Sequence, residues 1–593
     1  MIHLSLKSLA AVSITALLLA APAHAREPVK LGTVKPLIVA AEPEAAKAGM
    51  EVLKRGGTAA DAAVAVQAML ALIEPQSSSL SGGAFMLYYD ARTGELTDYN
   101  GREVAPMGAT PDMFMQDAAT PMTFKTAVLS GRSTGVPGAI FMLDRAQKDH
   151  GRLAWDSLFG DAEKAAADGF VVTPRIDKDL HTENATYPER DAPDVLAYFS
   201  DGKGGLVHAG DIKKNPDYAE TIKAIAAQRS DALRYGRIAQ DIVAKTHQDP
   251  IPGSMTTDDI ANYKVIATIA KPYVQTDDYH GKPLCAPYHQ YIVCTNNTPS
   301  GGPALLQGLR IAENLPLAKY GAHDPRGWAA LIEVERLMYA DRDRYEGDTA
   351  LFAKQINGYL NSNYTMSRAA TVAVGTPSPA PQPGQLPVFA PTPAADATIE
   401  PGGTTHYVIR DTFGNVVSMT TTVESLFGSG RMVDGFFLNN QLTDFSFTPK
   451  LPDGEPVANA VAPGKHPRSS MAPVIILDQK GHVVGAVGSP GGLSIIAYNL
   501  KTLIGVLDWG LSMQQAIDLP NVIARGDMIR VEKARMEPAV WDGLTKMGYN
   551  LTAVSGEESG LNGFILKNGR YDGGTDPRRE GVVLIGDHAQ TAK

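Results

Sequence analysis

The chain has 593 residues, of which 44% are hydrophobic and 20% are charged, and its formal net charge is −10. This composition is that of a globular protein large enough to bury an extensive core. The acidic excess, with no long run of Lys and Arg, argues against a nucleic-acid partner.

The first 25 residues resemble an export signal. Lys7 supplies a positive charge, an apolar run extends from Leu9 to Ala21, and Ala23-His24-Ala25 fits a small-x-small cleavage site. The run is shorter than the roughly 20 residues that a membrane-spanning helix needs, and no later segment is long enough without charges. We therefore expect no membrane span and a periplasmic or secreted protein whose mature chain begins at Arg26.

The first strong secondary-structure signal is a capped apolar helix. Thr58-Ala59-Ala60-Asp61 places a threonine at the N-cap and an acid three residues later, and the following residues stay apolar as far as Ile73. A helix that is apolar nearly all round is expected to be buried. Gly82-Gly83 then leads into a predicted strand from Phe85 to Tyr89.

The chain contains only two cysteines, Cys285 and Cys294. Their short spacing allows a disulfide across a hairpin, and export to an oxidising compartment favours that bridge over the alternative of two buried thiols. Two cysteines without a paired histidine motif do not make a zinc site.

Residues 370–403 are rich in proline and alanine. Proline at this density forbids a regular helix or a central strand, so we expect an extended, mobile segment. It is either an interdomain linker or the freed end of a cleaved chain, because it ends directly at Gly402-Gly403-Thr404.

Strand signals follow this segment. Thr404 to Arg410 and Val416 to Val423 are predicted to form a hairpin, and Pro473 to Leu477 with Val483 to Gly488 a second one. Gly491-Gly492 then opens an apolar helix from about Leu493 to Leu507. Strands packed face to face with helices outside would bury these segments.

Thr404 carries the clearest chemical signal. A threonine hydroxyl is a weak nucleophile until a base removes its proton. An α-amino group has a pKa near 7.7–8.0, so cleavage after Gly403 would give Thr404 its own base. Gly403 has no side chain to hinder the approach of its carbonyl to the Thr404 hydroxyl. The two residues therefore form a candidate self-cleavage site.

Further short motifs accompany this site along the chain. They are Gly56-Gly57-Thr58-Ala59-Ala60-Asp61-Ala62-Ala63, Glu74-Pro75-Gln76, Ser81-Gly82-Gly83-Ala84-Phe85, Gly101-Arg102-Glu103-Val104-Ala105-Pro106, Pro299-Ser300-Gly301-Gly302, Thr404-Thr405-His406-Tyr407, Leu438-Asn439-Asn440-Gln441, Pro467-Arg468-Ser469-Ser470-Met471 and Gly488-Ser489-Pro490-Gly491-Gly492. Together they resemble the motifs of the γ-glutamyltransferase family, over nearly the whole mature chain. The resemblance implies a self-cleaving N-terminal-nucleophile hydrolase with a four-layer αββα sandwich (α/β class), a large subunit 26–403 and a small subunit 404–593.

The resemblance also implies a role for each catalytic residue. Thr404 would attack the γ-carbonyl of glutathione or another γ-glutamyl compound, and water or an amino acid would resolve the ester. Thr422 would orient Thr404. Gly491 and Gly492 would supply the backbone N–H groups of an oxyanion hole. No cofactor or metal is expected, because every catalytic group belongs to the protein.

The family pattern likewise assigns the residues that hold the donor. Arg102, Ser469 and Ser470 match those that bind its α-carboxylate, and a planar guanidinium suits that contact. Asp444 and Gln441 match those at its α-amino group. Glu424 stands where some members carry asparagine and others glutamate. Residues 445–468, at the position of the family's lid, are of intermediate length and lack the tyrosine of some lids.

Rival signals in the chain are weaker. Gly131-Arg132-Ser133-Thr134-Gly135 matches an esterase pattern, but Val136-Pro137-Gly138 interrupts the helix that this motif requires, so we interpret it as a structural loop. No His-Glu-x-x-His string suggests a metal. We interpret His406 as a strand residue rather than a base, on the argument that neighbouring strand residues point to opposite faces.

Two other functions remain possible interpretations of the sequence. A cephalosporin or glutaryl acylase would share the fold and would also be made as a self-cleaving precursor. A glutaryl group, however, lacks the α-amino substituent that Asp444 would bind. A non-catalytic exported binding protein would keep Arg102 and Asp444 in a stable single chain. The intact nucleophile and glycine pair favour the γ-glutamyl enzyme over both.

Overall fold

The computed structural model describes residues 34–182, 187–271, 278–386, 398, 400–450, 454 and 457–586, and the backbone of 588–590. The predicted export signal therefore lies outside the described residues, as do 387–397 in the proline-rich segment. The described residues 370–386, 398 and 400–402 of that segment form no helix or strand, and Gly403 is the first residue of a strand.

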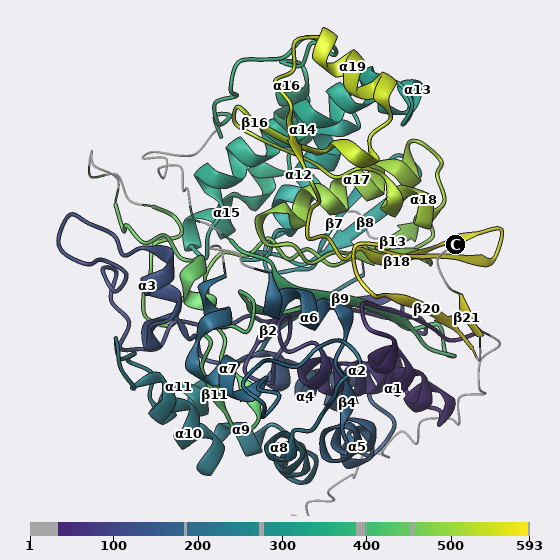
Figure 1. Ribbon diagram of the computed structural model, residues 1–593. Coiled ribbons are helices and arrows are strands. Elements are labelled where there is room, and N and C mark those ends of the chain that lie inside the picture. Colours follow the sequence, from purple (N-terminus) through teal and green to yellow (C-terminus); the bar gives the residue numbers. More distant parts are fainter. Residues whose placement is uncertain are drawn as a thin grey trace, which may run out of the picture.

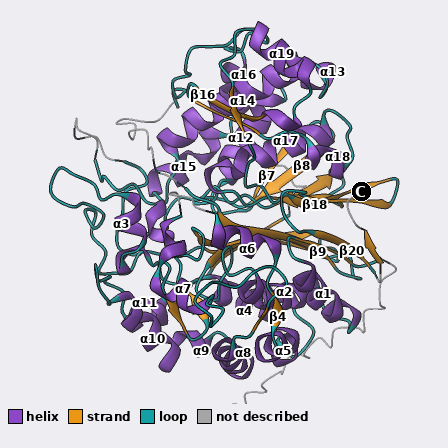
Figure 2. Cartoon of the chain, viewed as in Figure 1, coloured by secondary structure: helices purple, strands orange, loops and turns teal. Residues whose placement is uncertain are grey.

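Two antiparallel sheets packed face to face form the centre of the molecule (Figures 1 and 2). The larger sheet has the order β21-β20-β1-β9-β10-β2-β3-β6, and the smaller one β19-β18-β14-β13-β8-β7. The strands of the larger sheet are β1 Leu37–Ala40, β2 Gly83–Asp90, β3 Glu95–Gly101, β6 Ile266–Ala270, β9 Gly403–Arg410, β10 Val416–Glu424, β20 Val582–Ile585 and β21 His588–Gln590. Those of the smaller sheet are β7 Leu284–Tyr288, β8 Tyr291–Thr295, β13 Val474–Asp478, β14 Val483–Gly488, β18 Asn562–Lys567 and β19 Arg570–Thr575.

Helices cover the outer face of each sheet (Figure 1). The helices on the side of the larger sheet are α1 Pro43–Lys54, α2 Ala59–Ile73, α3 Phe124–Val128, α4 Ala139–His150, α5 Gly160–Asp168, α6 Pro174–His181, α7 Pro193–Tyr198, α8 Pro216–Gln228, α9 Asp231–Arg234, α10 Arg237–Thr246 and α11 Thr257–Asn262. Those on the side of the smaller sheet are α12 Gly302–Ala312, α13 Leu317–Tyr320, α14 Pro325–Tyr345, α15 Ala350–Tyr359, α16 Ser362–Ala369, α17 Ile495–Leu507, α18 Met513–Asp518 and α19 Pro538–Lys546.

The described residues also form two short strand pairs and a three-stranded sheet. The pairs are β4 Phe170–Val171 with β5 Ile212–Lys213 and β11 Met432–Val433 with β12 Phe436–Phe437, and the sheet consists of β15 Val522–Arg525, β16 Met528–Glu532 and β17 Thr552–Val554.

Successive side chains of β9 point to opposite faces of the larger sheet and join different cores. In β9, Tyr407 and Ile409 join the core under α2, whereas Val408 joins the core between the sheets, where it meets residues such as Ile475 and Phe564. A third core lies between the smaller sheet and helices α12, α14 and α17. The four-layer αββα prediction is therefore confirmed.

Local predictions hold as well. Helix α2 begins at the predicted capping box of Thr58 and Asp61, and all of its residues are buried. Both predicted hairpins form, as β9–β10 and β13–β14. The helix after Gly491-Gly492 begins with a 3₁₀ turn, Gly492–Ser494, before α17.

Candidate functional site

The junction of Gly403 and Thr404 lies at the start of β9, in the middle of the larger sheet. The chain is continuous across it, and Thr404 is buried. Thr404 lies directly opposite Thr422 on β10, and their hydroxyl oxygens are 2.9 Å apart. The Thr422 hydroxyl also donates to the Gly403 carbonyl oxygen at 2.8 Å. Since Thr422 has one hydroxyl proton, this geometry makes Thr404 the donor to Thr422.

A β-bulge shapes this junction. The pairing register shifts between Thr422 and Glu424, so that Glu424 faces Gly403. Glu424 has a φ of 83°, in the left-handed region that side chains rarely adopt. A Cβ on Gly403 would lie 2.3 Å from the Ser425 carbonyl oxygen, so glycine is required before Thr404. The bulge brings the Glu424 backbone N–H to the Thr422 hydroxyl at 2.8 Å.

Gly491 and Gly492 lie between β14 and α17, against the segment that precedes Thr404. Both have positive φ, 127° and 55°. A Cβ on Gly492 would lie 2.1 Å from the carbonyl oxygen of Glu400 and 2.5 Å from that of Pro401. The Leu493 N–H donates to the Glu400 carbonyl at 3.1 Å. The glycine turn and the residues before Thr404 are therefore packed backbone to backbone.

Arg102 and Asp444 form a buried ion pair. Arg102 follows β3 directly and is 1% exposed. Its Nη2 donates to Asp444 Oδ2 at 2.6 Å and to the Arg468 carbonyl at 2.8 Å. Gln441, in the same 3₁₀ turn as Asp444, donates to the same carboxylate oxygen at 2.6 Å. The structure thus brings these three predicted residues together.

Two carboxyl groups lie side by side here. Burial raises the pKa of Asp444 to about 6, against the opposing effect of Arg102. Burial and the neighbouring Asp444 carboxylate raise the pKa of Glu424 well above its usual value. Glu424, which Asn440 also contacts, is therefore the member of the pair that binds a proton more readily, and Asp444 is the more acidic one.

Ser469 and Ser470 face the same small cavity, whose lining also includes Arg102, Thr404, Thr422 and Gly492. The Ser470 hydroxyl donates to the Glu400 carboxylate. Arg342 Nη2 donates to both oxygens of that carboxylate, at 2.9 and 3.1 Å, and to the Ser470 hydroxyl at 2.7 Å.

Sequence reasoning missed four charged residues around the site: Glu400, Arg342, Arg468 and Arg579. Arg579 Nη1 donates to the Thr404 carbonyl at 2.7 Å. Arg468 stands within a quoted motif, next to Ser469, and Glu400 is the acid closest before Thr404, so both positions carried a signal. Arg342 and Arg579 are distant in sequence from every quoted motif.

The prediction about His406 was right in outcome and wrong in its reason. Residues 404 and 406 are two apart in β9, so they lie on the same face of the sheet. His406 Nδ1 contacts the Thr420 hydroxyl at 2.8 Å, and burial lowers its pKa to about 3. His406 is therefore a neutral, buried strand residue.

The esterase-like serine is also structural. Ser133 lies in a 3₁₀ turn, is fully buried, and donates to the carbonyl oxygens of Val128 and Ser130 at 2.8 Å. Cys285 and Cys294 lie opposite each other on β7 and β8 and are joined by a disulfide. Among the described residues, no helix is both long and apolar enough to cross a membrane.

A four-layer αββα sandwich with a threonine at the head of a central strand is the fold of the N-terminal-nucleophile hydrolases. A solved structure of this kind, the cephalosporin acylase from Bacillus halodurans, superposes with a TM-score of 0.77 over 97% of this chain and 99% of its own, at 23% identity. The likeness to that acylase establishes the fold.

The chain belongs to the gamma-glutamyltranspeptidase family, whose model matches residues 45–586. It is 32% identical to the glutathione hydrolase proenzyme of Bacillus subtilis (strain 168), over 92% of this chain and 91% of the relative. The proenzyme of the same description from Escherichia coli (strain K12) is 30% identical, over 91% and 90%. The gamma-glutamyltranspeptidase structure from Helicobacter pylori covers 59% of this chain and 95% of its own, at 27% identity and a TM-score of 0.53.

Proposed function

We propose that this chain is the precursor of an exported γ-glutamyltransferase, or glutathione hydrolase, that cuts itself between Gly403 and Thr404. The observation that carries the proposal is the contact of Thr422 with both the Thr404 hydroxyl and the Gly403 carbonyl. Family membership, with relatives described as glutathione hydrolase proenzymes, supports the same chemistry.

The first reaction is maturation. The Thr404 hydroxyl attacks the Gly403 carbonyl carbon, and Thr422 donates to the oxygen on which negative charge develops. The Gly403 C–N bond then breaks and an ester forms on the Thr404 oxygen, while the amine takes the proton. Water cleaves the ester, which leaves a carboxylate on Gly403 and a free α-amino group on Thr404.

The second reaction is group transfer. The freed α-amino group removes the proton of the Thr404 hydroxyl, which attacks the γ-carbonyl of a donor such as glutathione. The N–H groups at Gly491 and Gly492 stabilise the oxyanion, the donor's amine leaves with a proton, and a γ-glutamyl ester remains. Water or the amine of an amino acid or peptide then takes the γ-glutamyl group.

The donor's two charged ends need opposite partners. Arg102, Ser469 and Ser470 supply donors for its α-carboxylate. Asp444, with Gln441 and Glu424 beside it, accepts from its α-ammonium group. In the precursor Arg102 and Asp444 neutralise each other at 2.6 Å, so the zwitterionic donor replaces one internal contact with two.

The mature protein would comprise a large subunit 26–403 and a small subunit 404–593, located in the periplasm or outside the cell. The glutaryl acylase alternative shares the fold, whereas the ionised Asp444 in the pocket favours a substrate with an α-ammonium group. A non-catalytic binding protein would have no use for the Thr404–Thr422 contact.

The test compares a γ-glutamyl anilide with its glutaryl counterpart on the purified mature protein. We expect faster release of the aniline from the γ-glutamyl compound; faster glutaryl turnover would favour the acylase. Thr404→Ala should stay uncut and inactive. A Thr404→Ala chain that is cut normally at 403–404 would contradict the self-processing scheme.

A further inference from the structure

The residues just before Thr404 fill the pocket that the proposed function assigns to the donor. Glu400 and Pro401 line the cavity together with Arg102, Thr404 and Ser470. The remaining space is about 20 Å³, roughly the room that one water molecule needs. A γ-glutamyl group cannot enter while this segment is in place.

The side chain of Glu400 is anchored as a ligand would be. Its carboxylate is 3% exposed, accepts from Arg342 at 2.9 and 3.1 Å, and lies 3.5 Å from Arg468. Burial acts to raise its pKa, but Arg342 and Arg468 outweigh burial and hold the pKa at about 2. Its third partner is the hydroxyl of Ser470, which the family pattern assigns to the donor's α-carboxylate.

The same segment is anchored through its backbone. The Glu400 carbonyl accepts from Leu493 N–H, and the Gly403 carbonyl accepts from the Thr422 hydroxyl. The segment that carries the scissile carbonyl is therefore anchored at Glu400, three residues upstream, and the carbonyl itself accepts from Thr422 across the sheet.

From these contacts we propose that Glu400 is an internal carboxylate ligand that positions Gly403 for self-cleavage and blocks γ-glutamyl compounds until the cut segment leaves. The inference rests on the proposed function of the pocket. Glu400 is a positioning residue in this scheme, because it contacts neither the Thr404 hydroxyl nor the scissile bond.

The blocking role is tested without catalysis, in chains that carry Thr404→Ala and stay uncut. We expect L-glutamate, measured by calorimetry, to bind the Glu400→Ala/Thr404→Ala protein at least tenfold more tightly than the Thr404→Ala protein. Glu537→Ala/Thr404→Ala, which removes an exposed carboxylate, is the matched control. Equal glutamate affinity in all three proteins would overturn the blocking role.

The positioning role is tested with Glu400→Gln, which keeps the shape and removes the charge. We expect its self-cleavage half-life to lengthen at least tenfold, whereas Glu537→Gln, which neutralises an exposed carboxylate, should cleave at the wild-type rate. An unchanged half-life would overturn this role. If mature wild type instead lacks γ-glutamyl activity, the proposed function fails while the cleavage half-life still reports on Glu400.

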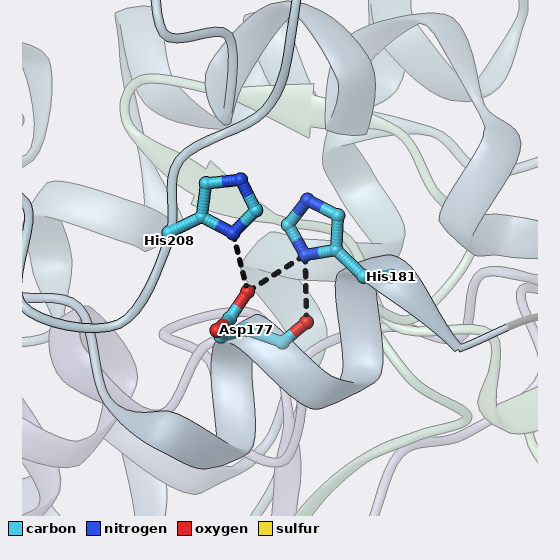
Figure 3. Close-up of side chains that lie close together, drawn as sticks. All are labelled: Asp177, His181 and His208. Carbon is cyan, nitrogen blue, oxygen red and sulfur yellow. Dashed lines mark hydrogen bonds and ion pairs between the residues drawn. The ribbon is translucent and has the colours of Figure 1, made fainter.

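A separate observation concerns a surface cluster of two histidines and an aspartate, far in sequence from the pocket residues (Figure 3). Asp177 and His181 lie one turn apart on α6, and His208 comes from the loop before β5. The Nδ1 atoms of His181 and His208 lie 2.8 and 3.0 Å from the same oxygen, Asp177 Oδ1. The two imidazole rings stack, with centroids 4.4 Å apart and planes at 11°.

These donor atoms suit a transition-metal ion. All three lie within 4.8 Å of one another, and neighbouring ligands of a tetrahedral Zn²⁺ with bonds of 2.0–2.2 Å are about 3.3–3.6 Å apart. The His208 loop is held independently, since His208 N–H donates to the Asp211 carboxylate and Asp211 N–H to the His208 carbonyl, at 2.8 and 3.0 Å.

The geometry points to a site for one divalent transition-metal ion of the zinc class, outside the proposed catalytic pocket. Two imidazole nitrogens and one carboxylate oxygen would bind it, with water in the remaining position. Such an ion would fasten the last turn of α6 to the loop before β5. The sequence alone did not indicate the site, because His208 lies far from the Asp177–His181 pair.

The test titrates untagged protein with Co²⁺, followed by visible absorption, and with Zn²⁺, followed by equilibrium dialysis. We expect one ion per chain, and at least tenfold weaker binding in His208→Ala and in Asp177→Asn. His482→Ala, which removes another exposed histidine paired with an aspartate, should bind as wild type does. Absence of saturable binding, or binding that His208→Ala leaves unchanged, would overturn the inference.

Discussion

Replacing Thr422 with valine removes one hydroxyl and keeps the side-chain shape. The lost contact is the 2.8 Å hydrogen bond to the Gly403 carbonyl, on which negative charge would develop in the proposed self-cleavage. Removing one oxyanion donor typically slows a reaction about 10²–10³-fold. Thr422→Val also leaves the Glu424 N–H without its partner, at a cost of about 1–3 kcal/mol of stability. That cost is smaller than the roughly 5–15 kcal/mol by which folded proteins are stable.

The assay follows the intact mass of freshly purified precursor over time, under native conditions and at fixed temperature, with the thermal melt as a control for folding. Thr420→Val is the matched variant, because Thr420 is a buried threonine on the same strand face whose hydrogen bond goes to His406. Thr422→Ser should mature nearly as wild type does. Maturation of Thr422→Val at the wild-type rate, or equal slowing by Thr420→Val, would refute the assigned role of Thr422.

Four further predictions concern donor binding, stability in acid and the disulfide. With the pKa of Asp444 at about 6, the KM for a γ-glutamyl anilide should fall as pH rises through 6, and Asp444→Asn should remove that dependence; a wild-type KM that is flat with pH would contradict this. Arg102→Lys keeps the positive charge but loses the planar guanidinium that can donate two parallel hydrogen bonds to a carboxylate. We therefore expect the KM for the γ-glutamyl anilide to rise about 10–100-fold in steady-state assays. An unchanged KM would show that Arg102 does not bind the donor. His406 has a folded pKa near 3 against about 6.5 unfolded, so its contribution to stability is complete above pH 6.5 and is lost as pH falls toward 3. His406→Asn should shrink the stability loss between pH 7.5 and 5 by about 2 kcal/mol in urea titrations, and an identical loss in both proteins would contradict it. The Cys285–Cys294 disulfide closes only a short loop, so its reduction should lower the melting temperature by only a few degrees. Global unfolding on reduction would contradict this prediction.

The pairing of Thr404 with Thr422 could be predicted from the sequence. The predicted turn places Arg410 opposite Val416, so an equal number of steps along each strand brings Thr404 opposite Thr422. The turn of a hairpin sets the register of its two strands, and a turn can be predicted from residues that are neighbours in the sequence. The bulge at Glu424 was not foreseen, because it depends on how the strand end packs rather than on a repeat of residue types.

The charged lining of the pocket was harder to predict. Glu400 meets Arg342 and Ser470 across distant parts of the chain, and a sequence pattern does not reveal ion pairs between segments. Predictions for Arg102 and Asp444 came from motif resemblance, and the structure places them in contact. The argument about His406 failed because it treated residues two apart in a strand as if they were adjacent.

The arrangement of the strands has a consequence for assembly. In the larger sheet, β9 and β10 are inserted between β1 and β2, and in the smaller sheet β8 pairs with β13. A cut at Gly403 would leave two polypeptides that share both sheets, so neither could complete its fold alone. Renaturation of the cut protein from denaturant would then be second order in protein, whereas the uncut precursor would refold as a single molecule. After self-cleavage, the protein could therefore no longer refold as a single polypeptide, as its precursor did.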